Sequence, residues 1–157
     1  MLFRSCDELG RLTRRIKDLD KQIATHARTL CPALLTRHGV GPIVAATLLA
    51  ELGDPRRLRS SAAFARMAGI APIPVSSANT DRHRLDRGGN RRLNHAVHTV
   101  ALTQARNHPH AQALIAKHRD RKGFHGAMRI LKRHLADALY RDLLTDFPPL
   151  TSTKITA

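Results

Sequence analysis

Apolar residues near the start of the chain recur at steps of three and four. They fall at Leu9, Leu12, Ile16, Leu19, Ile23 and Leu30, with a gap at His26. This is a heptad pattern, and charged residues fill most of the intervening positions. Two structures fit it: a coiled-coil arm that pairs with a second copy through residues 7–30, or an amphipathic helix packed on the chain's own core. Pro32 restricts the residue before it and ends the helix in either case.

The later periodicities predict further helices. A short apolar helix leads into Gly39-Val40-Gly41, a second spans 42–52, and a capped one spans 60–69 and buries Phe64 together with Met67 or Ala68. Longer helices are expected over about 90–108, from Pro109 to about 121, and over 126–144, with Gly123 as a stop. Their predicted inward faces are Leu93, Ala96, Val97, Val100 and Ala101, and then Ile130, Leu131, Leu135, Ala138, Leu139 and Leu143.

No confident strand emerges from these patterns. Prolines, serines and Asn79 favour a loop from Pro72 onward. The predicted fold class is therefore all-α, with a heptad arm over 1–31, a helical domain over 32–145 and a disordered tail over 146–157.

Gly39 and Gly41 lie between two short apolar helices, and Pro42 fits the first turn of the second. The arrangement resembles a helix-hairpin-helix, in which turn amides and the helix N-terminus bind a backbone phosphate without reading sequence. A purely structural helical hairpin is the alternative.

Charge narrows the class of partner. The 157 residues include 27 Lys and Arg against 12 Asp and Glu, a formal net charge of +15. Nucleic acid is the expected partner. No stretch approaches the roughly 20 apolar residues of a membrane span, and no secretory signal is evident, so we expect a cytoplasmic, nucleoid-associated protein. With aromatic residues at only 3%, base stacking is not expected to be the main binding mode.

Cations concentrate in two places. Five arginines between residues 82 and 92 accompany the glycine turn, and we expect Arg82, Arg84, Arg87, Gly88, Asn90, Arg91 and Arg92 to contact phosphate. Arginines in the first turn of a helix are disfavoured by its dipole, so a bound anion would compensate. A second cluster runs from residue 117 to 133, where a single carboxylate, Asp120, accompanies seven cations: Lys117, Arg119, Arg121, Lys122, Arg129, Lys132 and Arg133. Phosphate contact, expected above all at Lys122, Arg129, Lys132 and Arg133, and a solvated helix surface both fit this cluster.

Two cysteines and ten histidines supply no recognisable metal-ligand spacing. His95 and His98 lie one helical turn apart, but no carboxylate or cysteine accompanies them. We therefore expect no metal site in this chain.

Ser76 and Ser77 precede the arginine-rich turn. A serine that attacks a phosphodiester needs cations to neutralise the charge that develops on the phosphate oxygens. The segments "GVGPIVAATLLAELGD", "AGIAPIPVSS", "RHRLDRGGNRRLN" and "LKRHLADALYRDLL" occur in an order that resembles the C-terminal domain of the IS one-ten family of insertion-sequence transposases, from about Leu34 to Leu144.

The resemblance implies a function and its partners. It implies that Ser77 is a nucleophile acting on DNA, that Ser76 is its neighbour, and that the arginines after it bind phosphate. It further implies a composite site with an acidic, Mg²⁺-binding, RNase H-like domain, and a structured guide RNA. No cofactor is expected on this chain itself.

The sequence departs from the family pattern at Ala78, where the family has glycine, and in lacking a counterpart of the acidic domain. It therefore resembles a truncated or split transposase. The alternative is an inactive remnant that still binds DNA or RNA and dimerises through its first helix. A basic structural protein would explain the charge but not the ordered motifs.

Overall fold

The computed structural model describes residues 2–77, 80–84, 86 and 88–148. Its helices and strands are α1 (Leu2–Leu30), α2 (Pro32–Thr36), α3 (Pro42–Leu52), the 3₁₀ turn η1 (Pro55–Arg57), α4 (Ser61–Met67), β1 (Ile73–Ser77), β2 (Thr80–Arg84), α5 (Arg91–Asn107) and α6 (Pro109–Asp146). Among these residues no helix is long and apolar enough to cross a membrane.

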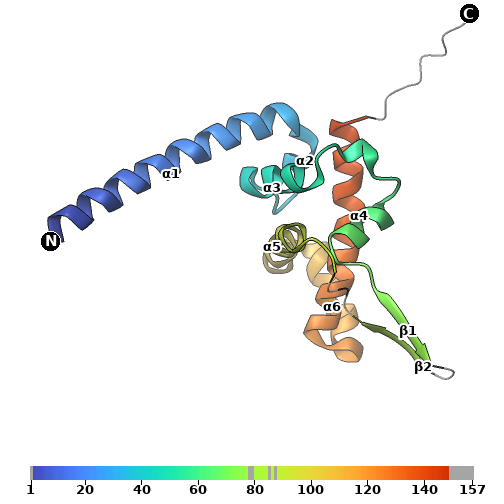
Figure 1. Cartoon of the computed structure of the whole chain (residues 1–157). Coiled ribbons are helices and arrows are strands. Elements are labelled where there is room, and N and C mark those ends of the chain that lie inside the picture. Colours follow the sequence, from blue (N-terminus) through green and yellow to red (C-terminus); the bar gives the residue numbers. More distant parts are fainter. Residues whose placement is uncertain (1, 78–79, 85, 87, 149–157) are drawn as a thin grey trace, which may run out of the picture.

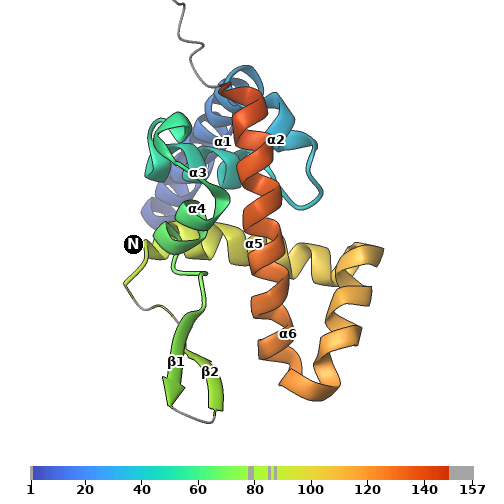
Figure 2. The same cartoon turned by 90° about the vertical axis from the view of Figure 1, so that its right-hand side faces the viewer.

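The fold is helical, as predicted, with one local correction. The stretch expected to be a loop contains an antiparallel hairpin, in which Ile73 pairs with Arg84 and Ser77 with Thr80. The hairpin extends from the helical body in Figures 1 and 2. Pro72 precedes β1, and Pro74 is the proline within it. In a two-stranded sheet each strand has a free edge, where a missing amide breaks no ladder.

Helix α1 extends away from the body as an arm (Figure 1). Its apolar seam is uncovered: Leu9 is 64% exposed and Ile16 58%. Only toward its C-terminal end does it join the core, where Ala27 and the following Cys31 are buried. The seam from Leu9 to Leu19 therefore does not pack on the core formed by the described residues.

Helices α5 and α6 supply much of the core. All five predicted inward residues of α5 are buried, as are five of the six predicted for α6. The sixth, Ile130, is half-buried and lines a cavity. Phe64 and Ala68 are buried as expected, whereas Met67 is 37% exposed. Burying one Leu or Val of this kind stabilises the fold by roughly 1.5–3 kcal/mol.

A sharp turn divides α6 into two segments, which fold back on each other in Figure 2. Gly123 has φ 67° and ψ 171°, a conformation that glycine alone adopts readily. The predicted stop at Gly123 is therefore confirmed. The second segment is tied to the rest of the body by the Tyr140 hydroxyl, which donates to the Leu58 carbonyl at 2.9 Å.

Contacts from α5 and α6 hold α2 and the turn that follows it. Asp146, the last residue of α6, accepts from the backbone amides of Ala33 and Leu34 at 2.8 and 2.9 Å and so caps α2. The Gln104 side chain of α5 donates to the His38 carbonyl at 2.7 Å. These contacts fix α2 and the turn before α3 against α5 and α6.

Candidate nucleic-acid interface

Two glycines bring the start of the hairpin and the start of α5 together. A Cβ on Gly89 would lie 2.1 Å from the Gly69 nitrogen and 2.3 Å from its Cα. The neighbouring Asn90 amide donates to the Met67 carbonyl at 2.7 Å. The backbone that follows β2 is therefore held against the end of α4, which sets where α5 begins.

Asn90 is a helix cap. Its side-chain oxygen accepts from the amides of Arg92 and Leu93 at 2.9 and 3.1 Å. Its side-chain nitrogen donates to a Glu51 carboxylate oxygen at 2.7 Å. Asn90, which the sequence suggests as a phosphate ligand, thus has both polar ends engaged by protein atoms.

Glu51 supplies negative charge at the N-terminus of α5. Its other oxygen lies 3.1 Å from Arg92 Nη1, although the Arg92 side chain is 80% exposed. The sequence suggests that an external anion must offset the arginines there, and part of that compensation comes from Glu51 itself. Arg91 is exposed beside it. Gly88 is exposed, and its amide donates to the Asp86 carboxylate at 2.8 Å.

The hairpin register places Ser77 and Arg84 at opposite ends of the hairpin. Ser77 is the last residue of β1, and Ser76 pairs with Asp81. Arg82 pairs with Val75, whereas Arg84 pairs with Ile73 at the opposite end. At about 3.3 Å per residue, the four steps from Thr80 to Arg84 span roughly 13 Å. Arg87 and Ala78 lie outside the described residues.

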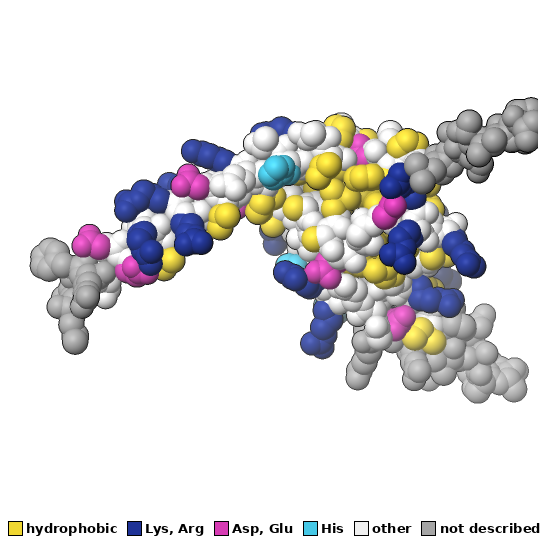
Figure 3. Space-filling view, turned by 45° about the horizontal axis from the view of Figure 1, so that its top comes forward, with side chains coloured by type: hydrophobic (Ala, Val, Ile, Leu, Met, Phe, Trp, Pro, Cys, Tyr) yellow, Lys and Arg dark blue, Asp and Glu magenta, His cyan; other side chains and the backbone are white. Residues whose placement is uncertain are grey.

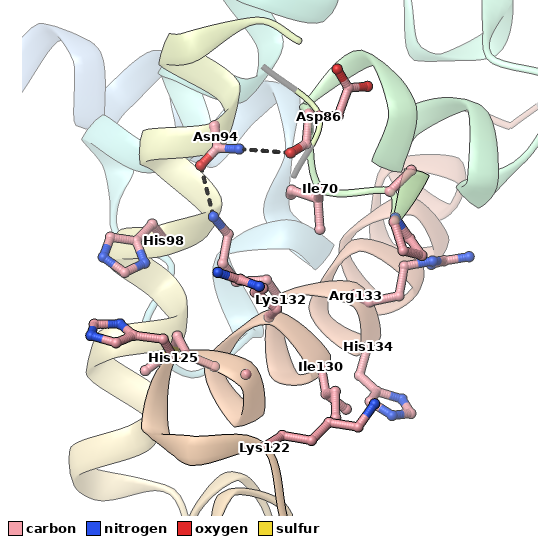
Figure 4. Close-up of a pocket in the computed structure, with 16 residues that line it drawn as sticks. Ile70, Asp86, Asn94, His98, Lys122, His125, Ile130, Lys132, Arg133 and His134 are labelled. Atoms are coloured by element: carbon pink, nitrogen blue, oxygen red, sulfur yellow. Dashed lines mark hydrogen bonds between the residues drawn. The ribbon is translucent and has the colours of Figure 1, made fainter. Parts of the chain in front are cut away.

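A cavity of about 860 Å³ opens beside the base of the hairpin (Figure 4). Residues 69–72, Asp86, α5, the second segment of α6 and Lys122 at the end of its first segment line it. Four of the seven cations of the second predicted cluster, Lys122, Arg129, Lys132 and Arg133, are among the lining residues. The other three, Lys117, Arg119 and Arg121, are exposed and do not line it. The tertiary structure thus brings this cluster together with residues near the serine-bearing strand.

Lys132 is held inside this cavity by a neutral partner. Its Nζ donates to the Asn94 side-chain oxygen at 2.7 Å, and the Asn94 nitrogen donates to the Ala68 and Gly69 carbonyls at 2.8 and 3.2 Å. Desolvation by burial lowers the pKa of Lys132, and the nearby charge of Arg129 lowers it further. The protonated amine is therefore held in surroundings that disfavour its charge.

The other polar lining residues have different environments. Arg133 is paired with Asp137 at 2.5 Å, whereas Arg129 and Lys122 are exposed. Burial lowers the pKa of His98, as do Lys132 and His95. Its imidazole is therefore favoured in the neutral form, which can donate and accept hydrogen bonds.

Sequence reasoning missed the roles of Glu51 and Asn94. Asn94 lies one helical turn after Asn90 within "GGNRRLN", and a polar residue beside the buried positions of α5 was the available signal. Glu51 could not be found in this way because it lies 39 residues from Asn90.

The predicted glycine pair has distinct surroundings. Gly39 has φ 85°, and a Cβ there would meet Thr103 Cβ at 3.2 Å and the Val100 carbonyl at 3.3 Å, so the turn packs tightly on α5. Gly41 precedes α3 as its N-cap, and a methyl group on it would have no atom of the described residues within 4 Å. Of the two, Gly41 has the open surroundings.

Within the described ranges, no three His, Cys, Asp or Glu side chains are grouped so as to hold a metal ion. This part of the chain therefore offers no set of carboxylates that fits a Mg²⁺ site.

A strong net positive charge with clustered Lys and Arg is typical of proteins that bind nucleic acid. The model of the Transposase IS116/IS110/IS902 family matches residues 31–116. This match covers more than half of the chain, and the chain belongs to that family.

Curated relatives agree with this family. The chain is 31% identical over 160 residues to the "Insertion element IS116 uncharacterized 44.8 kDa protein" of Streptomyces clavuligerus, covering 94% of this chain and 40% of the relative. It is 32% identical over 124 residues to the "Insertion element IS110 uncharacterized 43.6 kDa protein" of Streptomyces coelicolor, covering 69% and 31%. A "Probable family 20 transposase" of Pseudomonas aeruginosa is 37% identical over 78 residues, covering 48% and 23%. The chain thus spans less than half the length of these relatives.

Proposed function

We propose that this chain is the serine-bearing, DNA-binding part of an insertion-sequence transposase and acts in DNA transposition. Family membership and the strong positive charge support this function. The observation that carries the chemical proposal is the position of Ser77 at the end of β1 farthest from the base of the hairpin. A nucleophile there would approach DNA at the end of a projecting element (Figure 2).

The proposed reaction is a reversible transesterification. The Ser77 hydroxyl gives its proton to a base and its oxygen attacks phosphorus in a DNA strand. One bridging phosphorus–oxygen bond breaks, and the released strand end takes up a proton as a hydroxyl group. Attack by the hydroxyl of another strand on the phosphoserine ester then rejoins DNA and regenerates serine. No net hydrolysis occurs.

Charge on the reacting phosphate must be neutralised from nearby. By register, Arg82 is the predicted ligand closest to Ser77 along the paired strands, and Arg84, Arg91 and Arg92 belong to the base of the hairpin. We therefore assign Arg82 to the reacting phosphate and the others to neighbouring phosphates of the same DNA. The acidic, Mg²⁺-binding domain of the composite site is taken to come from outside the residues of this chain.

The net positive charge of the chain also supports a proposal about the nucleic acids that it binds. A duplex and a structured guide RNA both present closely spaced phosphates, and we propose that the protein binds both, at the nucleoid in the cytoplasm. The turn at Gly41 would contribute a backbone contact that does not depend on sequence.

We also propose that α1 pairs with α1 of a second copy. The exposed seam from Leu9 to Leu19 has the heptad spacing that such pairing requires. Charged side chains lie along the arm with hydrophobic ones between them, and a hydrophobic patch lies where the arm meets the body (Figure 3). Pairing would cover the seam.

Covalent trapping tests the chemistry. The chain is mixed with the acidic, RNase H-like domain of a transposase of this family and with labelled junction DNA, in a buffer that contains Mg²⁺. Protein–DNA adducts are then separated under denaturing conditions. Wild type and Ser5→Ala, which changes an exposed serine on α1, should both give an adduct. Ser77→Ala should give none while still binding the DNA. An adduct that persists in Ser77→Ala contradicts the proposal, and absence of any adduct from wild type favours the inactive-remnant alternative.

A further inference from the structure

The cavity beside the hairpin has more positive charge than its own residues neutralise. Lys122, Arg129, Lys132 and Arg133 line it together with one carboxylate, that of Asp86. Arg133 has an ion-pair partner in Asp137, and Asp86 accepts from the Gly88 amide. Among the described residues, no carboxylate lies within ion-pair distance of the other three cations.

Lys132 is the most informative of these cations. Its hydrogen-bond partner is the Asn94 amide, which orients the amine without neutralising it. Lys132 is half-buried, and a cation that is partly removed from water is destabilised unless an anion pairs with it. An anionic group placed beside Lys132 and Arg129 would offset the cost and favour the protonated amine. The first part of the expected ligand is therefore an anion such as phosphate.

A phosphate alone would leave most of the cavity unused. Ile70, Ala71 and Pro72 form one apolar wall, and Met128 and Ile130 contribute another from α6. The volume of about 860 Å³ lies within the range of pockets that enclose small organic ligands, which are lined mainly by apolar groups with a few polar ones. The ligand is thus expected to join an anion to a flat or bulky group with a large apolar surface.

Unpaired nucleotides have this composition. Enzymes that extrude a nucleotide from a duplex hold its base between aromatic or apolar side chains and bind its edge by hydrogen bonds. Here the walls are aliphatic, with His98 and His125 as polar groups that can bond a base edge (Figure 4). A paired nucleotide inside a duplex could not enter the cavity, because its base remains stacked on its neighbours and hydrogen-bonded to the opposite base.

We infer that this cavity binds one unpaired nucleotide of the DNA strand, with its phosphate at Lys132 and Arg129 and its base against Ile70 and Ile130. The inference rests on the proposed function in taking DNA as the partner. It adds a second contact between the protein and the DNA strand, at a fixed distance from the hairpin, because Pro72 of the cavity wall directly precedes β1. Ser77 lies five residues further, roughly 16 Å along an extended strand. A captured nucleotide would therefore set the position of the DNA relative to the hairpin.

Equilibrium binding to matched DNA tests the inference. The probes are a fluorescent duplex with one unpaired central nucleotide, the same duplex fully paired, and the same bulge with an abasic residue. Wild type should bind the bulged duplex about tenfold more tightly than the paired duplex, a difference of about 1.4 kcal/mol. The abasic bulge should lose most of that preference.

Two variants and one control separate the cavity from general charge. Lys132→Met and the exposed Arg129→Gln should each remove most of the preference for the bulge, and Arg129→Gln keeps the test informative should Lys132→Met fail to fold. Lys17→Met, the same loss of charge at an exposed position on α1, should keep the preference in full. A deoxynucleoside monophosphate at millimolar concentration should compete for the bulged probe.

Several outcomes would overturn the inference. These are equal affinity of wild type for bulged and paired DNA, an abasic bulge that binds as tightly as the intact one, or full preference in both cavity variants. Binding of the free nucleotide without preference for the bulge would assign the cavity to a small molecule instead. These measurements require no strand cleavage, so their failure is distinguishable from failure of the Ser77 adduct test.

Discussion

At the scale of single residues, the contact between Gly69 and Gly89 determines how the hairpin joins the body. A methyl group on Gly89 would fall 2.1 Å from a backbone nitrogen, and backbone cannot move aside as a flexible side chain can. The adjacent Gly88 differs: its Cβ would meet the Asp86 carboxylate at 3.4 Å, which is close to ordinary contact.

Gly89→Ala should therefore lower the free energy of unfolding by about 1–3 kcal/mol or more, in the range of overpacked sites. Gly88→Ala should change it by less than about 0.5 kcal/mol, as is usual at surface positions. Urea denaturation followed by circular dichroism measures both. Equal stability of the two variants would mean that the two glycine backbones are not in close contact.

Residue types alone did not reveal which polar side chains serve the fold. Asn90 and Lys132 both resemble phosphate ligands in a basic sequence, yet Asn90 is engaged by α5 and Glu51, and Lys132 by Asn94. Lys132 retains an unneutralised charge and stays a candidate ligand. For Asn90, capping of α5 is a sufficient structural role.

At the scale of elements, α1 is the helix whose apolar face lacks a partner within the described chain. Leu9, Leu12, Ile16 and Leu19 are between 45% and 64% exposed. The helix is long enough for about four heptads over its 29 residues. A second copy of the same helix would remove this surface from water.

Ile16→Gln should disrupt that dimer, whereas Lys17→Gln at a neighbouring exposed position should leave it intact. Each of the two chains loses the roughly 1.5–3 kcal/mol gained by burying one isoleucine side chain. The dissociation constant of the dimer should therefore rise by roughly 100-fold or more. Light scattering after size exclusion, over a range of concentrations, measures the mass. A monomeric wild type at high concentration would refute pairing through α1.

The hairpin was the element that local patterns did not predict. Pro72, Pro74 and the serines are typical of loops, and a five-residue strand carries too few positions to establish alternation. Pairing of β1 with β2 and the close contact between Gly69 and Gly89 at the base of the hairpin stabilise an element that the local sequence does not predict. The long helices were predictable because each repeats its apolar spacing over many turns.

At the scale of the whole molecule, the net charge of +15 predicts binding dominated by counterion release. Cations that already have a carboxylate partner should contribute little. Arg11 pairs with Glu8 at 2.6 Å and Arg56 with Asp54 at 2.8 Å. Arg91 and Arg129 have no such partner within the described residues.

The logarithm of duplex affinity should fall linearly with the logarithm of salt concentration. The double variant Arg91→Gln, Arg129→Gln should reduce the slope by up to about 1.8, at about 0.9 per phosphate contact. The double variant Arg11→Gln, Arg56→Gln should leave the slope near that of wild type. Fluorescence anisotropy over a salt series measures the three slopes, and a flat response of wild type would argue against phosphate binding.

The sequence by itself determined the helical class, the buried faces of α5 and α6, the break at Gly123 and the basic character, because each depends on local periodicity, backbone preference or composition. Only the tertiary structure decided that the apolar seam of α1 stays exposed and that Ile73–Ser77 and Thr80–Arg84 pair as the strands of a hairpin. It also decided that Lys132 and Arg129 share a cavity with the segment preceding that hairpin. The cavity depends on contacts between residues far apart in the chain, and the exposure of the seam depends on where the rest of the fold lies, so no local pattern encodes either. The hairpin is local in sequence, but its strands are too short to show a periodicity of their own.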